Sequence, residues 1–353
     1  MNKGNQLNLT ANFTSGSNVT GCVYQSYGMS SIIIMGATAF VVCTFGLLAN
    51  AVNIRIFNHP VMRKTSINWY LLTRAVSDCI VLIATLLFLT LPRCAELLGL
   101  YRLLEYMVYI TPISYALGKT ARMMSVYMTV AMTAHRFVGV CFPFKAHQIL
   151  TKARVKIILA GTLIFCFLYC FPCFFAVKNG DSCFNSTLNA NIRSVRPSAL
   201  MRDKHYQIVY RVFMYTFFYF VFPFSALIIM NSKVIYAVHQ SRKLHNETEP
   251  DQASKRQELR KEISTSIMLI GVVVVFLTCN SLAFMINIHA LIKDDRPYTL
   301  VVEVSNLLVN IGASINFFVY FLFSEKHRVL FKYYCCCFGC RKGEMLLTSL
   351  VEL

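Results

Sequence analysis

Several ionisable side chains of this chain lie within long apolar stretches of sequence, where a charge needs a partner or a polar cavity. Arg74 and Asp78 stand four residues apart and share one helix face, and Lys119 and Arg122 stand three apart in the next stretch. Where such a stretch crosses a membrane, a central charge costs about 3 kcal/mol or more. These positions are therefore expected to serve binding or conformational change.

The sequence has no pattern typical of an enzyme in these stretches. We find no nucleophile beside a base, no pair of catalytic carboxylates, and no His/Cys cluster with metal-ligand spacing. We expect a protein that is not an enzyme and that uses no metal and no cofactor.

Seven stretches of roughly 20 or more mostly apolar residues run along the chain, each long enough to cross a bilayer as a helix. A hydrophobic content of 56% is more than one soluble core of 353 residues could hide. In lipid, every backbone polar group needs a partner within its segment, so the sequence predicts an all-α, seven-transmembrane helix bundle. The predicted spans are 31–57, 66–92, 103–137, 155–177, 207–238, 261–292 and 299–323.

The charges outside the spans predict the orientation of the chain. Lys and Arg number about 20 on one side and about 11 on the other, and the positive-inside rule makes the richer side cytoplasmic. The N-terminus is then extracellular in a multi-pass plasma-membrane protein. The net charge of +18 forms no basic stripe with interleaved aromatic residues, which argues against nucleic acid as a partner. Glycosylation sequons on the outer side occur at Asn8, Asn12, Asn18 and Asn185.

A short helix outside the membrane-spanning bundle is expected after the seventh span. Residues 324–334 alternate basic and apolar residues at helical spacing, which is typical of an amphipathic helix on the inner, cytoplasmic leaflet. The chain thus divides into a glycosylated tail (1–30), a bundle (31–323), and a cytoplasmic helix with its tail (324–353). Palmitoylation is favoured over a zinc cluster for the cysteines that follow, which are Cys335, Cys336, Cys337 and Cys340.

Two ion pairs are candidates for a conformational switch. Asp78 has Arg122 within reach on the next span and Arg74 as a competing partner on its own helix. Such a pair is either permanently structural or exchanged between states. At the cytoplasmic side, Arg136 ends the third span and Glu262 begins the sixth, so an ion pair between them would hold a cleft shut.

The outer end of the bundle is expected to be electropositive. Lys119 lies one turn outward from Arg122, and the loop 178–206 adds further Lys and Arg residues. One interpretation is a cationic cavity for an anionic group of a ligand, with Glu303 and its acidic neighbours on the opposite rim. The other is that the loop cations are solvated and that Lys119 snorkels outward.

A series of short motifs follows the spans in order. They are Gly46-Leu47-Leu48-Ala49-Asn50, Ala75-Val76-Ser77-Asp78, Arg136-Phe137, Pro172, Pro223, Phe276 with Cys279, and Asn316-Phe317-Phe318-Val319-Tyr320. With these motifs in this order, the chain resembles the rhodopsin-like G-protein-coupled receptors over nearly all of residues 30–338. The Asn-Phe-Phe-x-Tyr run of the seventh span and the run 140–146 are similar to invertebrate neuropeptide receptors of the FMRFamide and myosuppressin group.

The resemblance implies roles for individual residues. Asp78, Asn50 and Asn316 correspond to the network that couples ligand to helix motion and that holds sodium in some relatives. Arg136 and Tyr320 correspond to residues that rearrange to receive a heterotrimeric G-protein.

The chain also departs from the family's pattern. His135 replaces the usual acid before Arg136, and Thr111 replaces the cysteine of the family's disulfide. Cys183 then needs another partner, and we favour Cys94 over Cys22.

The resemblance predicts a receptor for an extracellular neuropeptide that acts on a heterotrimeric G-protein. The basic cavity fits peptides ending in Arg-Phe-amide poorly, so an acidic or zwitterionic peptide stays open, as does a chemoreceptor for a small anionic cue. A transporter or channel is the alternative from another class, although paired Gly/Pro-broken spans in two related halves are missing. The ligand and the G-protein subtype are left undetermined. The candidate ligand-binding residues are Lys119, Arg122, Tyr115, Asn280 and Glu303.

Overall fold

The structure is a computed structural model of the full chain. It describes residues 26–185, 188–247, 253–293 and 299–336, with side chains left out mainly at 241–247, 253–266, 290–293 and 335–336.

Seven long helical segments make up the bundle, in the order that the sequence predicts. Six of them are long and apolar enough to cross a membrane. The remaining one, α6, is 41 residues long but carries more polar residues. The first span is α1 (Met29–Ser31), η1 (Ile32–Thr38) and α2 (Ala39–Phe57); the second is α4 (Ile67–Thr85), η2 (Leu86–Thr90) and α5 (Leu91–Leu97); the third is α6 (Tyr101–Cys141); the fourth is α8 (Lys152–Cys170) and η3 (Phe171–Phe175); the fifth is η4 (Tyr206–Met214), η5 (Thr216–Val221) and α10 (Phe222–Glu247); the sixth is α11 (Ala253–Lys293); and the seventh is α12 (Thr299–Phe323).

The position of α6 in the bundle explains why it tolerates more polar residues than the other spans. It contacts α4, α8, α10 and α11, so much of its surface faces other helices and not lipid. The remaining neighbours complete a ring, with α2 against α4 and α12, and α11 against α12.

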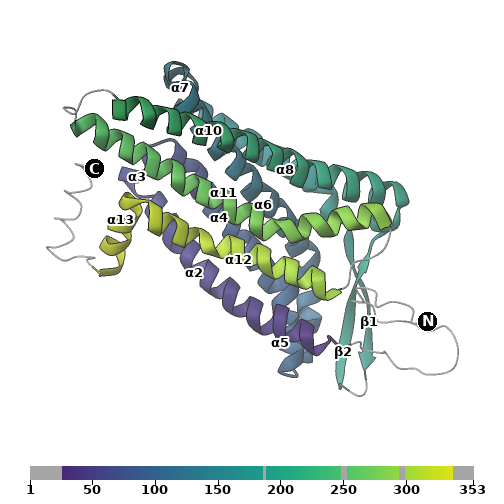
Figure 1. The fold of residues 1–353 in the computed structure, drawn as a ribbon. Helices are drawn as coiled ribbons and strands as arrows, with labels where there is room; N and C mark the ends of the chain where they lie inside the picture. Colours follow the sequence, from purple (N-terminus) through teal and green to yellow (C-terminus); the bar gives the residue numbers. More distant parts are fainter. Residues whose placement is uncertain (1–25, 186–187, 248–252, 294–298, 337–353) are drawn as a thin grey trace.

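The two ends of the bundle carry different elements (Figure 1). A two-stranded antiparallel hairpin, β1 (Val177–Asn185) with β2 (Ala190–Pro197), lies at one end and packs on α6. The helix α13 (Glu325–Cys336) follows the seventh span at the other end and contacts α2. We call these the hairpin end and the α13 end. Short helices join the spans as α3 (Pro60–Arg63), α7 (Pro143–Ile149) and α9 (Ala199–Arg202).

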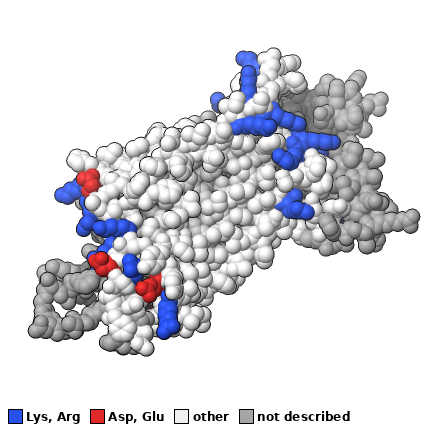
Figure 2. Space-filling view, turned by 180° about the vertical axis from the view of Figure 1, so that it is seen from behind, with Lys and Arg blue, Asp and Glu red and all other residues white. Residues whose placement is uncertain are grey.

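The surface between the two ends suits a lipid environment. Large apolar side chains are exposed along the outward faces of the spans, among them Phe40, Leu163 and Ile229. Figure 2 shows a wide uncharged belt on one face, with the charged residues gathered at its two ends. The visible Asp and Glu residues lie at the hairpin end. An exposed apolar surface of this extent is what a bundle solvated by lipid presents.

Close helix contacts fix the first and seventh spans against each other. Ser314 donates hydrogen bonds to the carbonyls of Val42 (3.2 Å) and Asn310 (2.8 Å). A β-carbon at Gly46 would overlap the Ser314 hydroxyl, so only glycine fits there without a shift.

The structure confirms the seven predicted spans and the amphipathic helix, and it adds the hairpin. The segment 178–206 is predicted as a loop, but most of it pairs as β1 and β2, with an irregularity between Asn179 and Ser182. The second span also extends beyond its predicted end at residue 92 to Leu97, because the π-helical turn η2 carries the helix on through Pro92.

The predicted disulfide between Cys94 and Cys183 is wrong. Cys183 is disulfide-bonded, whereas Cys94 is a free thiol. Cys94 belongs to α5, and its Sγ lies beside Gly36 of the first span, while Cys183 lies on the hairpin. The alternative partner Cys22 lies outside the described residues.

Candidate functional site

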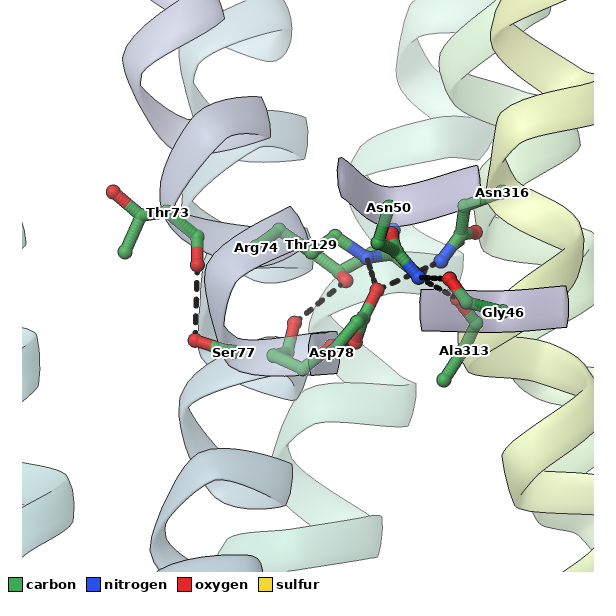
Figure 3. Close-up of polar contacts among 10 residues, drawn as sticks. Gly46, Asn50, Thr73, Arg74, Ser77, Asp78, Thr129, Ala313 and Asn316 are labelled. Carbon is green, nitrogen blue, oxygen red and sulfur yellow. Dashed lines mark hydrogen bonds and ion pairs between the residues drawn. The ribbon is translucent and has the colours of Figure 1, made fainter. Parts of the chain in front are cut away.

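A buried network of polar side chains joins the second, third and seventh spans at mid-bundle (Figure 3). The Asp78 carboxylate accepts hydrogen bonds from Ser125 Oγ (2.6 Å) and Asn316 Nδ2 (2.9 Å). Arg74 Nε lies 3.7 Å from Asp78 Oδ2, and Arg74 Nη2 donates to Asn316 Oδ1 at 3.2 Å. The predicted grouping of Asp78 with Asn316 is therefore present as direct contacts.

Asn50 belongs to the same region but makes different contacts. Its Nδ2 donates to the carbonyls of Gly46 and Ala313, each at 2.9 Å, and so ties the first span to the seventh. Thr85 donates to Asn310 at 3.1 Å nearer the hairpin end. These bonds make α12 the shared partner of the first and second spans.

Of the two candidate partners of Asp78, the structure selects Arg74. Arg122 makes no hydrogen bond or ion pair with another residue that the structure describes, and it lines a central cavity together with Asn280 and Tyr219. Arg74 reaches the Asp78 carboxylate because the two residues lie one turn apart on the same face of α4.

Lys119 and Tyr115, two of the predicted ligand-binding residues, lie together. The Lys119 ammonium stands 4.8 Å from the ring centre of Tyr215 and 5.9 Å from that of Tyr115. Aromatic faces attract a cation, so these rings offset part of the cost of burying the charge. Lys119 is thus partnered by protein groups without any ligand.

Glu303 takes part in an ion pair at the hairpin end. Arg93 Nη2 lies 3.0 Å from Glu303 Oε1, and Ser31 Oγ bridges the two residues at 2.7 Å and 2.5 Å. The Arg93 guanidinium also lies 4.5 Å from the ring centre of Tyr27. Burial raises the pKa of the Tyr27 phenol against the opposing effect of Arg93, so the ring stays neutral. Glu303 therefore links the first, second and seventh spans.

A separate pocket opens at the hairpin end, and none of the predicted ligand-binding residues lines it. Its empty volume is about 550 Å³, and it lies between the second span, α6 and β2, with Tyr27 contributing from the segment before α1. Glu105 and Arg193 are its ionisable lining residues other than tyrosines. Arg193 is held by the ring of Tyr109, at 4.9 Å, and by the Gly180 carbonyl, at 3.4 Å.

The pocket was missed because it depends on the hairpin folding back over α6, which no motif in the sequence signals. A weak signal was available in the polar side chains of α6 at its hairpin end, where Glu105 stands among apolar neighbours.

The α13 end holds the residues predicted to couple to a G-protein. The His135 ring packs edge-on against Tyr70, with ring centres 5.9 Å apart, and Tyr320 is buried against Phe57 at 5.2 Å. Arg136 lies on the same turn of α6 as His135. The Glu262 side chain lies outside the described residues, so its ion pair with Arg136 stays a prediction.

Helix α13 docks onto the first span through a buried histidine. His327 is fully buried, and its Nε2 lies 3.0 Å from Asn53 Oδ1. Burial lowers the pKa of His327 to about 3, which keeps the docked imidazole neutral. No sequence motif indicated this contact.

The predicted modification sites are only partly covered. Asn185 is described; it is buried, and its Oδ1 accepts a hydrogen bond from the Leu188 amide at 3.0 Å, so a glycan there would need this turn to open. Among the described residues there is no group of three or more His, Cys, Asp or Glu side chains placed to hold a metal ion. Asn8, Asn12, Asn18, Cys337 and Cys340, and the side chains of Cys335 and Cys336, lie outside the described residues.

Comparison with known proteins identifies the fold. The model of the 7 transmembrane receptor (rhodopsin family) matches residues 49–320. The FMRFamide receptor of Drosophila melanogaster is 30% identical over 300 residues, which is 84% of this chain and 53% of that receptor, so the chain spans about half of its length. The FMRFamide peptide receptor frpr-18 of Caenorhabditis elegans is 28% identical over 308 residues, covering 85% of this chain and 68% of the relative.

A vertebrate relative aligns over a similar length at lower identity. The human growth hormone secretagogue receptor type 1 is 26% identical over 310 residues, 84% of this chain and 80% of the relative. The family match covers most of the bundle, including the Asp78 network and the α13-end residues Arg136 and Tyr320. This chain belongs to the rhodopsin family of seven-transmembrane receptors.

Proposed function

We propose that this chain is a plasma-membrane receptor for an extracellular neuropeptide and that it activates a heterotrimeric G-protein at its α13 end. Family membership supports the receptor function, and the FMRFamide receptors among the relatives support a peptide ligand. The observation that carries the proposal is the pocket at the hairpin end, which β2, α6, the second span and Tyr27 line. It offers a peptide end a mostly apolar chamber with one acid, Glu105, and one cation, Arg193, which Tyr109 and the Gly180 carbonyl already hold.

Glu105 is the residue suited to a cationic peptide. It is half-buried, accepts only a 3.4 Å hydrogen bond from Ser182, and has no ion-pair partner among the described residues. A peptide ending in Arg-Phe-amide carries a guanidinium, which pairs with a carboxylate in two parallel hydrogen bonds. Phe88 and Val108 line the same pocket and provide apolar contact for an aromatic ring.

The positive charges of Lys119 and Arg122 do not argue against a cationic peptide in this pocket. Lys119 faces two tyrosine rings and Arg122 faces the central cavity, so neither lines the pocket that holds Glu105. A cationic peptide would be repelled only if Lys119 and Arg122 lay in the same site as the peptide.

A single helix connects the pocket to the opposite end. α6 contributes Glu105 and Thr111 to the pocket, Ser125 to the Asp78 carboxylate, and Arg136 to the α13 end. A ligand that contacts the hairpin end of α6 would favour the arrangement of the bundle that it binds best. Because α6 is one continuous helix, a change in its position would also move Arg136.

The hairpin end is the extracellular end in this proposal. On the face drawn in Figure 2, the described acidic side chains lie at this end, and the described residues toward the α13 end include Lys and Arg but no Asp or Glu. That asymmetry fits the positive-inside rule with α13 in the cytoplasm.

The test is a screen of amidated peptides on cells that express the full chain, with binding of a non-hydrolysable guanine nucleotide to G-protein as the readout. We expect an amidated, Arg-containing peptide to stimulate nucleotide binding. Glu105→Gln should weaken its potency about 10- to 100-fold, as expected for one charge-assisted bond. Asp181→Asn is the matched control, because Asp181 is an exposed acid of the same hairpin end, and it should leave potency unchanged.

One result would contradict the receptor function, and a second would contradict the role of Glu105. The first is a chain present at the cell surface that responds to no peptide but conducts ions or transports a solute. The second is equal potency for Glu105→Gln and Asp181→Asn, which would remove Glu105 from the site while leaving the receptor function standing.

A further inference from the structure

The central cavity of the bundle has an unusual charge balance. It has an empty volume of about 370 Å³ and lies between α4, α6, η5, α11 and α12. Its ionisable lining includes two guanidinium groups, Arg74 and Arg122, against a single carboxylate, Asp78. The Tyr219 side chain in the lining is neutral, so the lining carries a net charge of +1. Lys119 lies one turn from Arg122 on α6.

The Asp78 carboxylate is already bonded to other groups and does not pair with Arg122. Asp78 already accepts from Ser125 and Asn316, and it pairs with Arg74 at 3.7 Å. Arg122 has no hydrogen bond or ion pair with another described residue. Arg122 is half-buried, and a guanidinium in the interior of a membrane-spanning bundle is costly without a partner, so this cavity suits a negatively charged group.

The unused polar atoms of the lining are mainly donors. Arg74 Nη1 and the Tyr219 hydroxyl are buried without hydrogen-bond partners, Arg74 Nε has only its 3.7 Å ion-pair contact with Asp78, and both side chains are less than 5% exposed. Asn280 uses its Nδ2 on the Phe276 carbonyl at 2.8 Å, which leaves its Oδ1 as the one unpaired acceptor. N–H and O–H donors that line one cavity with a net positive charge match an anion.

We infer that this cavity binds a small monovalent anion, chloride in the cell, held beside Arg122 by the donors of Arg74 and Tyr219. A sodium ion at the same place would face two guanidinium groups against one carboxylate, so the lining as a whole would repel it. Water could satisfy the donors but would leave the net charge uncompensated. The bound anion neutralises it.

The anion would act as a structural link. It would join groups from the second, third and fifth spans, and it would stabilise the arrangement in which these groups converge. Any shift of α6 that moves Arg122 away from Arg74 would weaken the site.

The experiment measures thermal unfolding of the purified full chain in detergent at constant ionic strength. Sodium gluconate is replaced stepwise by sodium chloride, and separately potassium gluconate by potassium chloride. We expect the unfolding midpoint to rise with chloride to a plateau, equally for both cations, and to rise with bromide as well. Stabilisation that follows sodium and ignores the anion, or a midpoint that does not respond to chloride, would overturn the inference.

Three variants place the effect in the cavity. Tyr219→Phe removes one hydroxyl donor and should weaken apparent chloride affinity about tenfold, the value of one hydrogen bond to a charged group. Arg122→Leu should abolish the chloride response. Arg202→Leu is the control, since Arg202 is an exposed cation at the hairpin end, and it should respond like the parent chain.

If Arg122→Leu fails to fold, Tyr219→Phe still tests whether chloride binds in this cavity. A chloride response of unchanged affinity in Tyr219→Phe would show that the anion binds elsewhere and would refute the assigned site.

Discussion

Replacing Glu303 by Gln should destabilise the bundle while leaving the affinity for a peptide ligand intact. Glu303 and Arg93 form an ion pair of 3.0 Å with side chains only 7% and 10% exposed. Gln removes the negative charge at nearly the same volume and leaves the Arg93 guanidinium buried and uncompensated. The effect therefore measures the loss of a partner, with little change in packing.

The size of the loss follows from the contacts that Arg93 keeps. Removing one partner of a buried ion pair costs about 3–5 kcal/mol. Arg93 still donates to Ser31 at 2.7 Å and to the Leu89 carbonyl at 2.6 Å, and it still lies over the Tyr27 ring. We expect the lower end, about 3 kcal/mol, or roughly a hundredfold in the unfolding equilibrium.

The assay is unfolding of the purified protein in detergent, with surface expression and ligand potency measured in cells. The double variant Arg93→Met/Glu303→Met should lose less stability than Glu303→Gln, because no orphan charge remains. Glu325→Gln, an exposed acid at the start of α13, is the control and should be neutral.

An unfolding midpoint for Glu303→Gln equal to that of the parent chain would refute the reasoning. A large fall in potency at normal stability would instead assign Glu303 to the ligand, as the sequence suggested.

Three further predictions concern the two ends of the bundle. Cys183→Ser should lower surface expression because it removes a disulfide, whereas Cys94→Ser should not, since Cys94 is a free thiol; surface labelling compares the two, and equal losses would contradict this. For His327, burial lowers the docked pKa to about 3, so its stabilising contribution is present above the ordinary pKa of about 6.5 and is lost as pH falls below it. Docking of α13 should weaken by about 1.4 kcal/mol at pH 5.5, seen as faster hydrogen exchange in α13, and a His327→Phe chain should not show this pH dependence. Glu262→Ala should raise basal guanine-nucleotide exchange if it restrains Arg136, and a normally expressed variant with unchanged basal exchange would count against that lock.

The bundle itself was predictable because lipid leaves a chain few choices. A stretch of about 20 apolar residues must satisfy its backbone hydrogen bonds internally, so length and hydropathy fix the number and order of the spans. The grouping of Asp78 with Asn316 was predictable only through the resemblance, since spacing alone does not say which span lies beside which.

The hairpin was not predictable in the same way. The segment 177–197 is polar, and its pairing depends on a turn near Asn189, which adopts a positive φ of 45°, and on packing against α6. Neither feature leaves a strong periodic pattern. The pocket at the hairpin end was missed for the same reason, because β2 forms one of its walls.

The partner of Glu303 was missed for a different reason. The predicted second span ended at residue 92, which placed Arg93 in a loop. The structure continues the helix through the π-helical turn at 86–90, and the wider turn changes which face of the following residues points inward. Arg93 is thereby brought to Ser31 and Glu303, a rotation that hydrophobic periodicity cannot reveal.

The interior cations show most clearly where sequence reasoning stops. The sequence places three of them within spans and the structure adds Arg93, but the way each is neutralised depends on helix rotation: Arg74 by the Asp78 carboxylate, Arg93 by Glu303, and Lys119 by two aromatic rings. Arg122 stands outside these pairings in the described part of the chain, although a charge in this position needs compensation as much as the other three. An uncompensated guanidinium next to buried, unused donors is what the chloride experiment addresses, and the same geometry explains why a sodium site is not expected beside Asp78.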